Sequence, residues 1–342
     1  MNINKRVLGN VDMVYATAIM NIKGQLNYIV ASEGQNSCIA YNSDSFEKQT
    51  VWDSPGGTMN IVPIPGREDE FIATQKFFPI FDAKESKIVY AKLDNCNRWD
   101  IQPIMNIPYL HRFDIFELKG ELHFIGCTLC SSKETKDDWS NPGKVYVGKL
   151  SNNIVEPFEL TIIIGEITKN HGFCSTEWKG RKSYIVTGVE GAYVIYVPDN
   201  EKDWEYEKIL DHEVSDIAVV DIDGDGNMEI ATIEPFHGNK AVIYKNISEK
   251  WMSIYECELE FGHVVWGGNI LNKPSFIIGE RKGSTKLICV QMKESLEEDY
   301  AEYLIDNTGG TSNISVVHQL GKDIILAANR EIGEVAIYEL TK

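Results

Sequence analysis

Residues 24–42, GQLNYIVASEGQNSCIAYN, combine a turn glycine, a very apolar segment, a short polar loop and a segment rich in β-branched and aromatic residues. Apolar segments this short predict β-strands, and the Gly, Asn and Ser residues between them predict turns. The pattern recurs seven times, with its turn at Gly24, Gly66, Gly120, Gly180, Gly226, Asn272 and Gly321. We therefore expect an all-β chain built from repeats of about 40 to 60 residues.

Each turn is followed by an expected second and third strand. The second strands are LNYIVAS, EFIAT, LHFIGC, SYIVTG, MEIATI, SFIIG and DIILAA, and the third strands are SCIAYN, FPIFDA, KVYVGKL, AYVIYV, KAVIYK, TKLICV and EVAIYEL. More variable fourth strands follow in six copies. The seventh copy lacks one, and residues 3–9, INKRVLG, can supply it. The prediction is a single domain over residues 1–342, a seven-bladed β-propeller with four-stranded blades whose ring is closed by the N-terminal strand.

The bulk composition excludes several classes of protein. The sequence has no apolar run long enough to span a bilayer and begins without a signal-peptide pattern, so we expect a cytoplasmic protein. A net charge of −18 argues against nucleic acid as a partner. Seven scattered cysteines, an odd number, are typical of reduced thiols rather than of a disulfide framework.

The fifth copy contains an acidic loop, DIDGDGNME, at residues 221–229. Alternating oxygen ligands with glycines between them wrap a loop around a hard cation, and calcium is its natural occupant. The alternative is an acidic turn without metal. The predicted structural calcium ligands are Asp221, Asp223, Asp225, Asn227 and Glu229.

This loop and the apolar strand EIATI that follows it resemble the FG-GAP or VCBS repeat family of β-propellers, whose hallmark is a DxDGDGxxE/D loop. The resemblance implies a propeller scaffold for the whole chain and no particular activity. Only the fifth of the seven turns carries the motif, because the other six have lost its acids.

Three histidines share one position of the repeat. His111, His171 and His263 each lie nine residues before a turn residue, at Gly120, Gly180 and Asn272. First strands line the channel of a propeller, so we expect these histidines at one mouth of it, with His237 on the same face. Any one of them could instead bind a loop carbonyl. Together, His171, His237 and His263 could hold zinc or manganese.

Other polar residues are expected around the same mouth. Glu190, Glu234 and Glu280 are candidates, with the four histidines, for catalytic proton transfer, although each could be a solvated loop acid. The candidate substrate-binding residues are Tyr15, Lys76, Arg281 and Arg330, of which the two arginines could bind a carboxylate or phosphate. His123, His212 and His318 do not share the register of the repeat.

Two functions fit these patterns. The first is a metal-assisted lyase, dehydratase or isomerase acting on a sugar or sugar acid at the channel mouth, where metal and arginine would stabilise an enediolate. The chain has only a loose architectural likeness to propeller lyases and aldos-2-ulose dehydratase, which supports this first function. The second is a non-catalytic propeller that binds a carbohydrate or a protein. The chain lacks GxSxG and P-loop motifs, so nucleophilic serine and nucleotide chemistry have no support.

Overall fold

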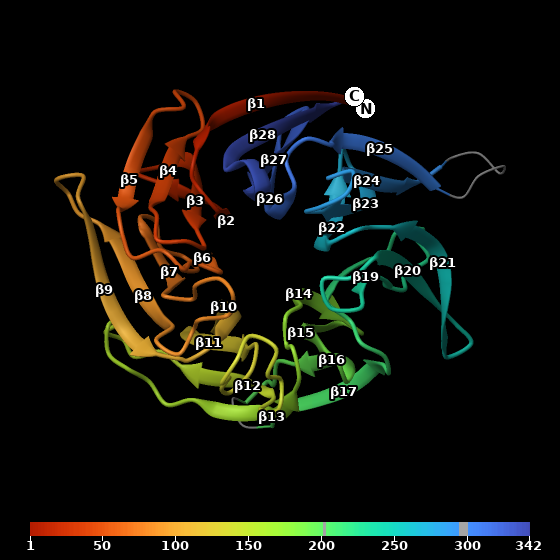
Figure 1. Ribbon diagram of the computed structural model, residues 1–342, viewed down its shortest axis with the longest axis horizontal. Coiled ribbons are helices and arrows are strands. Elements are labelled where there is room, and N and C mark those ends of the chain that lie inside the picture. Colours follow the sequence, from red (N-terminus) through yellow and green to blue (C-terminus); the bar gives the residue numbers. More distant parts are fainter. Residues whose placement is uncertain (201–202, 294–299) are drawn as a thin grey trace. The chain divides into compact units, whose positions relative to one another are not determined.

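The computed structural model describes residues 1–200, 203–293 and 300–342 and confirms the predicted fold class. The chain is all-β, with seven four-stranded sheets arranged as a β-propeller (Figure 1). It divides into two compact units. The N-terminal unit contains Val7–His171 and Gly333–Val335, and the C-terminal unit contains Met1–Arg6, Gly172–Ile332 and Ala336–Lys342. That all 342 residues form a single domain stays a prediction.

The N-terminal unit contains three complete sheets in the orders β2-β3-β4-β5, β6-β7-β8-β9 and β10-β11-β12-β13. Their strands are β2 (Val14–Ile22), β3 (Gln25–Ser32), β4 (Cys38–Asn42), β5 (Lys48–Trp52), β6 (Ile61–Pro63), β7 (Glu70–Gln75), β8 (Lys87–Leu93), β9 (Trp99–Asn106), β10 (Leu110–Leu118), β11 (Glu121–Thr128), β12 (Gly143–Lys149) and β13 (Thr161–Ile167).

The C-terminal unit contains the sheets β14 to β17, β18 to β21 and β22 to β25, and most of the last sheet, β1-β28-β27-β26. The strands are β14 (Phe173–Trp178), β15 (Arg181–Gly188), β16 (Gly191–Tyr196), β17 (Glu205–Leu210), β18 (Asp216–Val220), β19 (Glu229–Glu234), β20 (Lys240–Ile247), β21 (Lys250–Glu258), β22 (Gly262–Ile270), β23 (Lys273–Glu280), β24 (Leu287–Met292), β25 (Tyr300–Asp306), β26 (Thr311–Gln319), β27 (Lys322–Asn329), β28 (Glu334–Thr341) and β1 (Asn2–Asn10), with the 3₁₀ turn η1 (Arg330–Ile332) before β28.

The N-terminal strand completes the last sheet, as the sequence predicts. β1 lies beside β28 (Figure 1), and the side-chain amide of Asn2 donates to the carbonyl of Lys342 at 2.9 Å. The ammonium of Lys5 lies 2.8 Å from a carboxylate oxygen of Asp306 at the end of β25. The first residues of the chain are therefore tied both to the last strand and to the neighbouring sheet.

The seven turn residues that define the repeat share a left-handed backbone. Gly24, Gly66, Gly120, Gly180, Gly226 and Gly321 have φ between +71° and +89°, and Asn272 has φ +64°. Glycine adopts this conformation without steric cost, and Asn tolerates it better than most residues do. This shared requirement explains why glycine or asparagine recurs at one position of the repeat.

The second strands are apolar throughout because both of their faces are covered. Phe71 and Ala73 of β7 pack into one core cluster, whereas Ile72 packs into the next. In β23, Phe276 and Ile277 likewise belong to different clusters. Alternate side chains of a strand point to opposite faces, so β7 and β23 each contribute to two cores.

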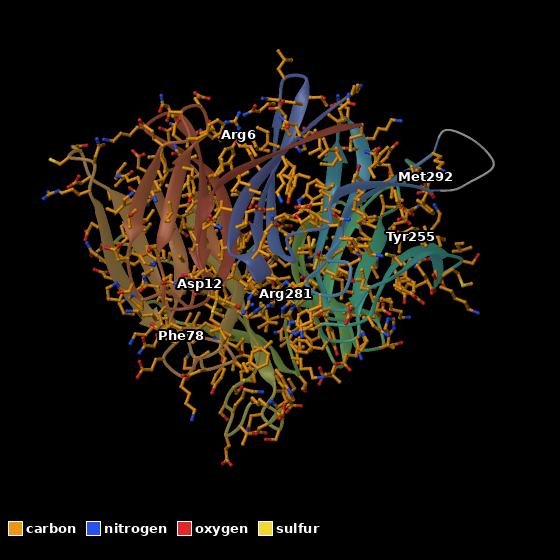
Figure 2. All side chains as sticks on the ribbon, turned by 45° about the horizontal axis from the view of Figure 1, so that its top comes forward. Arg6, Asp12, Phe78, Tyr255, Arg281 and Met292 are labelled. Atoms are coloured by element: carbon orange, nitrogen blue, oxygen red, sulfur yellow. The ribbon has the colours of Figure 1, made fainter. Side chains whose placement is uncertain are left out.

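One predicted strand is wrong. Residues 78–83, FPIFDA, were expected as the third strand of the second sheet, but that strand is β8. Phe78 (Figure 2) forms only an isolated bridge with Asp82, and Ile80 is 65% exposed. The apolar run has the composition of a strand, but Pro79 has no N–H to donate to a ladder.

Among residues 1–200, 203–293 and 300–342, no helix has the length and apolar character that a membrane crossing requires. The seven cysteines are free thiols.

Candidate functional site

A β-bulge occurs at the same position in four of the sheets. The extra residue is Tyr15 in β2, His111 in β10, His263 in β22 and Ser312 in β26. Each is the second residue of a first strand, and in each case the pairing with the second strand skips it. A bulge rotates its extra residue out of the regular alternation, which is how sheets re-aim side chains near functional sites. The repeat position that the histidines share is therefore also the position of the β-bulge in these four sheets.

In the N-terminal unit, the side chains at this position are gathered and buried. The imidazoles of His111 and His171 have their ring centroids 4.4 Å apart, and both residues are at most 3% exposed. The hydroxyl of Tyr15 lies 3.5 Å from Nε2 of His111, and Phe77 meets the same ring edge-on. The structure therefore brings together Tyr15, His111 and His171, three of the predicted site residues.

In the C-terminal unit, His263 has a defined tautomer. Its Nδ1 lies 2.7 Å from the carbonyl oxygen of Ser312, and His263 is 2% exposed. A carbonyl oxygen can only accept, so Nδ1 carries the proton and Nε2 carries the lone pair of the neutral ring. A backbone carbonyl that holds one ring nitrogen in this way is the usual support of a histidine metal ligand.

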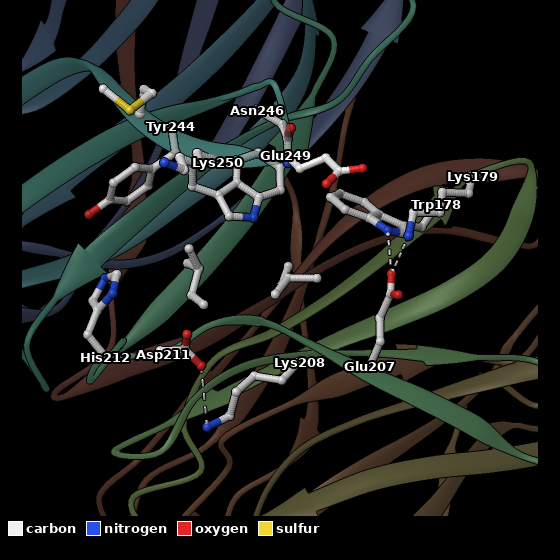
Figure 3. Close-up of a pocket in the computed structure, with 14 residues that line it drawn as sticks. Trp178, Lys179, Glu207, Lys208, Asp211, His212, Tyr244, Asn246, Glu249 and Lys250 are labelled. Carbon is white, nitrogen blue, oxygen red and sulfur yellow. Dashed lines mark hydrogen bonds and ion pairs between the residues drawn. The ribbon is translucent and has the colours of Figure 1, made fainter.

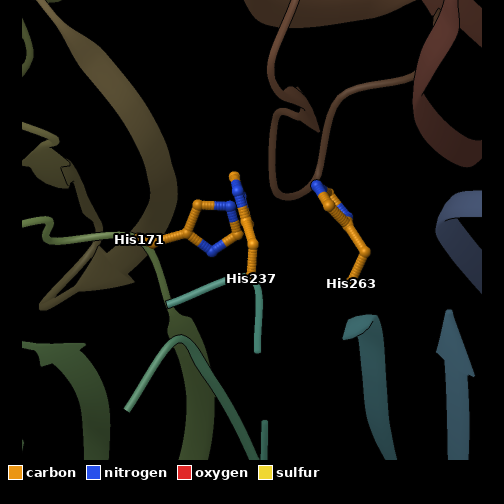
Figure 4. A group of neighbouring side chains, drawn as sticks. All are labelled: His171, His237 and His263. Carbon is orange, nitrogen blue, oxygen red and sulfur yellow. The ribbon is translucent and has the colours of Figure 1, made fainter. Parts of the chain in front are cut away.

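His237 lies beside His263. The two rings are stacked, with centroids 5.4 Å apart and planes 24° apart (Figure 4, which also draws His171, the last residue of the other unit). Phe236 and Phe261 pack on the His237 ring at 4.1 and 4.7 Å. The backbone of His237 is left-handed, with φ +48°, and its N–H donates to the hydroxyl of Ser215. The loop after β19 is thus folded so that His237 meets His263.

Two arginines share one carboxylate beside this pair. Arg281 (Figure 2) donates from Nε and from one terminal nitrogen to Oε1 of Glu331, at 2.8 and 2.5 Å, and Arg330 donates to the same oxygen at 3.2 Å. The guanidinium of Arg281 lies 5.1 Å from the centre of the Phe261 ring. Both guanidiniums therefore donate to the same oxygen of one carboxylate.

The other predicted residues lie in different surroundings. Glu280 accepts from the backbone N–H of Glu260 at 2.6 Å and from the hydroxyl of Ser284, so it stabilises its own loop. Lys76 forms an ion pair with Glu85 at 2.8 Å in the N-terminal unit. Glu190 lies in the turn between β15 and β16 and is partly exposed.

The buried carboxylate of Glu234 is paired with the half-exposed His212, a partner that the sequence does not predict. Nε2 of His212 lies 2.8 Å from Oε1 of Glu234, which also accepts from the hydroxyls of Thr232 and Tyr244. Burial raises the pKa of Glu234, but the hydrogen bonds from His212 and Thr232 outweigh it and hold that pKa below its ordinary value. No local motif joins two residues 22 positions apart, so only the fold reveals this pair.

The acidic loop joins β18 to β19, as predicted, and an ammonium group lies among its carboxylates. Lys245 of β20 forms ion pairs with Asp223, with Asp225 at 2.6 Å and with Glu229 at 3.3 Å. Asp221 instead accepts three backbone N–H groups of the loop, from Gly224, Asp225 and Gly226. The donor set suits calcium in composition, but a cation of the chain itself competes for it.

No protein-family model matches the chain, and no curated protein matches it either. Solved structures are similar over its whole length. The β-propeller domain of Cps50 (Swd1) from Myceliophteria thermophila has a TM-score of 0.62 at 7% identity and covers 100% of both chains. The PQQ-bound aldose sugar dehydrogenase of Streptomyces coelicolor has a TM-score of 0.50 at 12% identity, over 100% of this chain and 99% of that one. A luciferin-regenerating enzyme has a TM-score of 0.49 at 10% identity, over 100% and 96%.

These likenesses concern the fold alone. The seven-bladed propeller is supported, whereas the FG-GAP or VCBS family, which the acidic loop resembles, is not shown by any family match.

Proposed function

We propose that the chain is a cytoplasmic, metal-dependent lyase, dehydratase or isomerase that acts on a sugar acid. In this proposal His237 and His263 bind a divalent zinc or manganese ion, and His171 is the third ligand that the register of the repeat predicts. Arg281 and Arg330 bind the carboxylate of the substrate. Within the N-terminal unit His111 packs on His171 and contacts Tyr15, and Tyr15 and Lys76 are the other proposed substrate contacts.

The tautomer of His263 carries the proposal. The carbonyl of Ser312 holds the proton on Nδ1, so Nε2 presents its lone pair, and this is the state that a metal ligand needs. His237 is stacked on the same ring and held in a left-handed backbone that costs roughly 1 kcal/mol. The stability of the strands does not require two stacked imidazoles, whereas a bound cation does require adjacent nitrogen donors.

The charge of the neighbouring arginines indicates the substrate class. Arg281 and Arg330 are 12% and 16% exposed at their side chains, and both contact the carboxylate of Glu331. A planar guanidinium fork matches a carboxylate in geometry as well as in charge. An anionic sugar derivative fits such a site better than a neutral sugar.

The expected chemistry is elimination of water or isomerisation next to the carboxylate. A base removes the hydrogen from the carbon beside the carboxylate, the neighbouring hydroxyl takes up a proton and leaves as water, and the enol that remains becomes a keto acid. A divalent ion supplies positive charge that stabilises the carboxylate as it gains electron density. The proposed groups for proton transfer are Glu190, Glu234 and Glu280, of which Glu234 binds His212 and Glu280 binds the backbone N–H of Glu260.

The similarity to an aldose sugar dehydrogenase supports small-molecule binding only in general terms, because at 12% identity the likeness is one of fold. Calcium in the acidic loop, bound in competition with Lys245, remains part of the proposal and has a structural role.

Metal analysis of the purified protein tests the proposal. The protein is depleted with chelator, incubated with Zn²⁺ or Mn²⁺ and passed over a desalting column, and about one ion per chain is expected by mass spectrometry. The loaded protein is then screened with aldonic and uronic acids for keto acid, measured as the semicarbazone. A chain that retains neither ion overturns the enzyme proposal and favours a binding module.

A further inference from the structure

A cleft lies in the C-terminal unit, between the outer strand β17 of one sheet and the β20–β21 hairpin of the next (Figure 3). Its volume is about 660 Å³, within the range of small-molecule sites. Its lining includes none of the histidines and arginines of the proposed metal site. A ligand bound here would therefore be recognised by other residues.

Two indole rings form part of the wall. Trp178 and Trp251 have ring centroids 6.2 Å apart and planes inclined by 38°. Trp178 is 5% exposed, whereas Trp251 is only partly buried and lines the cleft. An indole face packs well against the C–H groups of a flat apolar surface, and its polar edge tolerates water.

Glu207 provides a fixed acceptor next to the indoles. Its Oε1 accepts from Nε1 of Trp178 at 3.3 Å, from the ammonium of Lys179 at 2.8 Å and from the hydroxyl of Tyr196 at 2.7 Å. Three donors on one oxygen hold the carboxylate in one orientation. The second oxygen, Oε2, keeps acceptor capacity for the hydroxyl groups of a ligand.

His212 provides a second oriented polar group on the cleft wall. Glu234 holds its Nε2 at 2.8 Å, so in the neutral ring Nδ1 is the acceptor, and the side chain is 45% exposed. Glu234 is itself fixed by Thr232 and Tyr244. The cleft therefore has two oriented acceptors, Glu207 within β17 and His212 just after that strand ends.

The charges that line the cleft cancel. Lys179, Lys208 and Lys250 are matched by three acids, Glu207, Asp211 and Glu249, so these six formal charges sum to zero. Lys179 is paired with Glu207 at 2.8 Å, and Lys208 lies 3.8 Å from Asp211. A balanced lining on a chain of net charge −18 selects neither an anion nor a cation. The complementary ligand is neutral and rich in hydroxyl groups, with an apolar face.

We propose that this cleft binds a neutral saccharide, whose ring packs on Trp251 and whose hydroxyl groups donate to Glu207 and His212. The site is independent of the proposed metal site, and its ligand need not be the substrate of that site.

Calorimetric titration with maltopentaose, cellopentaose and xylopentaose tests the inference, with trigalacturonate as the anionic comparison. At least one neutral probe is expected to bind with a dissociation constant of about 1 mM or tighter. Trp251→Ala is expected to weaken that binding at least tenfold, and Glu207→Gln by about tenfold. Tyr206→Ala is the matched control, because Tyr206 is an exposed aromatic residue of β17 outside the lining, and it is expected to change the affinity less than about twofold.

A loss of structure in Trp251→Ala is checked by circular dichroism. Glu207→Gln provides the second test, because its side chain is 37% exposed and keeps the shape of the carboxylate. In the wild type, the indole N–H signals of Trp178 and Trp251 are expected to shift on addition of the bound probe. The inference is overturned if no neutral probe binds at about 10 mM, if trigalacturonate binds more tightly, or if both variants bind as the wild type does.

Discussion

Nδ1 of His263 donates to the backbone carbonyl of Ser312. Each of the two residues is the extra residue of its own β-bulge, and the two bulges lie in neighbouring sheets of the C-terminal unit. The same repeat position thus supplies both the histidine and the acceptor that fixes its tautomer. In the N-terminal unit, Tyr15 and His111 occupy this bulge position and also contact each other. Contacts between equivalent residues, rather than the histidines taken singly, make this position a candidate site.

His263→Ala and His237→Ala are each expected to weaken binding of Zn²⁺ or Mn²⁺ by at least about 100-fold, because each removes a nitrogen donor. His171→Ala tests the third ligand in the same way. The measurement is metal content after desalting. His318→Ala is the control, because that histidine is 57% exposed at its side chain and pairs with Asp323. Equal metal content in all four variants would contradict the histidine site.

Arg281→Lys is expected to raise the KM for a sugar acid by about tenfold or more while kcat changes less, because lysine cannot form the two-pronged contact. Glu331→Gln is expected to lower the KM, since it removes the internal carboxylate that occupies the guanidiniums. Arg181→Lys, a change in an ion pair with Glu205, is the control. If Arg281→Lys left the KM unchanged, these arginines would not be the carboxylate site.

The fold could be predicted because each repeat carries a strong local signal. The second strands are apolar on both faces, and the turns need glycine or Asn272 in a left-handed backbone. The third strand at residues 78–83 was mispredicted because an apolar run around Pro79 satisfies the same composition. Residues 78–83 do not form the strand and β8 does, because Pro79 cannot complete the backbone hydrogen bonding of a ladder.

The candidate site could be predicted only in part. The shared register located His111 and His263, but not the bulges, because a bulge depends on how two strands pair and leaves no mark in either one. The partners of Glu234 and Arg281 were missed for a similar reason. His212 and Glu331 lie far from them in sequence, and side-chain pairing at that distance is set by the packing of neighbouring sheets.

Lys245→Met is expected to make the acidic loop bind calcium at least tenfold more tightly. In the wild type, the ammonium group of Lys245 neutralises Asp223, Asp225 and Glu229, and the variant removes it. Burial lowers the pKa of Lys245, but its hydrogen bonds to Asp223 and Asp225 outweigh this and raise that pKa above its ordinary value, so the side chain is charged at neutral pH. Without calcium, the variant is expected to melt at a lower temperature than the wild type.

The measurement for Lys245→Met is thermal unfolding in chelator and in calcium, with Lys250→Met as a control outside the loop. Calcium is expected to raise the melting temperature of Lys245→Met more than that of either the wild type or the control. No response to calcium in Lys245→Met would show that the loop is an acidic turn and not a calcium site.

Asp306→Asn is expected to lower the free energy of unfolding by roughly 2 kcal/mol at pH 7. Burial raises the pKa of Asp306, but the hydrogen bonds from Lys5 and Tyr338 outweigh it and lower that pKa from 3.8 to about 2. A carboxyl group with a depressed pKa in the folded state stabilises the fold above its unfolded pKa, and this contribution is lost as the pH falls. The difference between wild type and variant should therefore shrink between about pH 4 and pH 2.

Urea unfolding over this pH range measures the effect of Asp306→Asn, and Asp53→Asn, a change at an exposed carboxylate, is the control. Lys5→Met should reproduce much of the loss at pH 7, because the ion pair between Lys5 and Asp306 links the N-terminal strand to β25. If Asp306→Asn and Asp53→Asn had the same stability at every pH, the link between the first residues and β25 would contribute nothing to the closure of the last sheet.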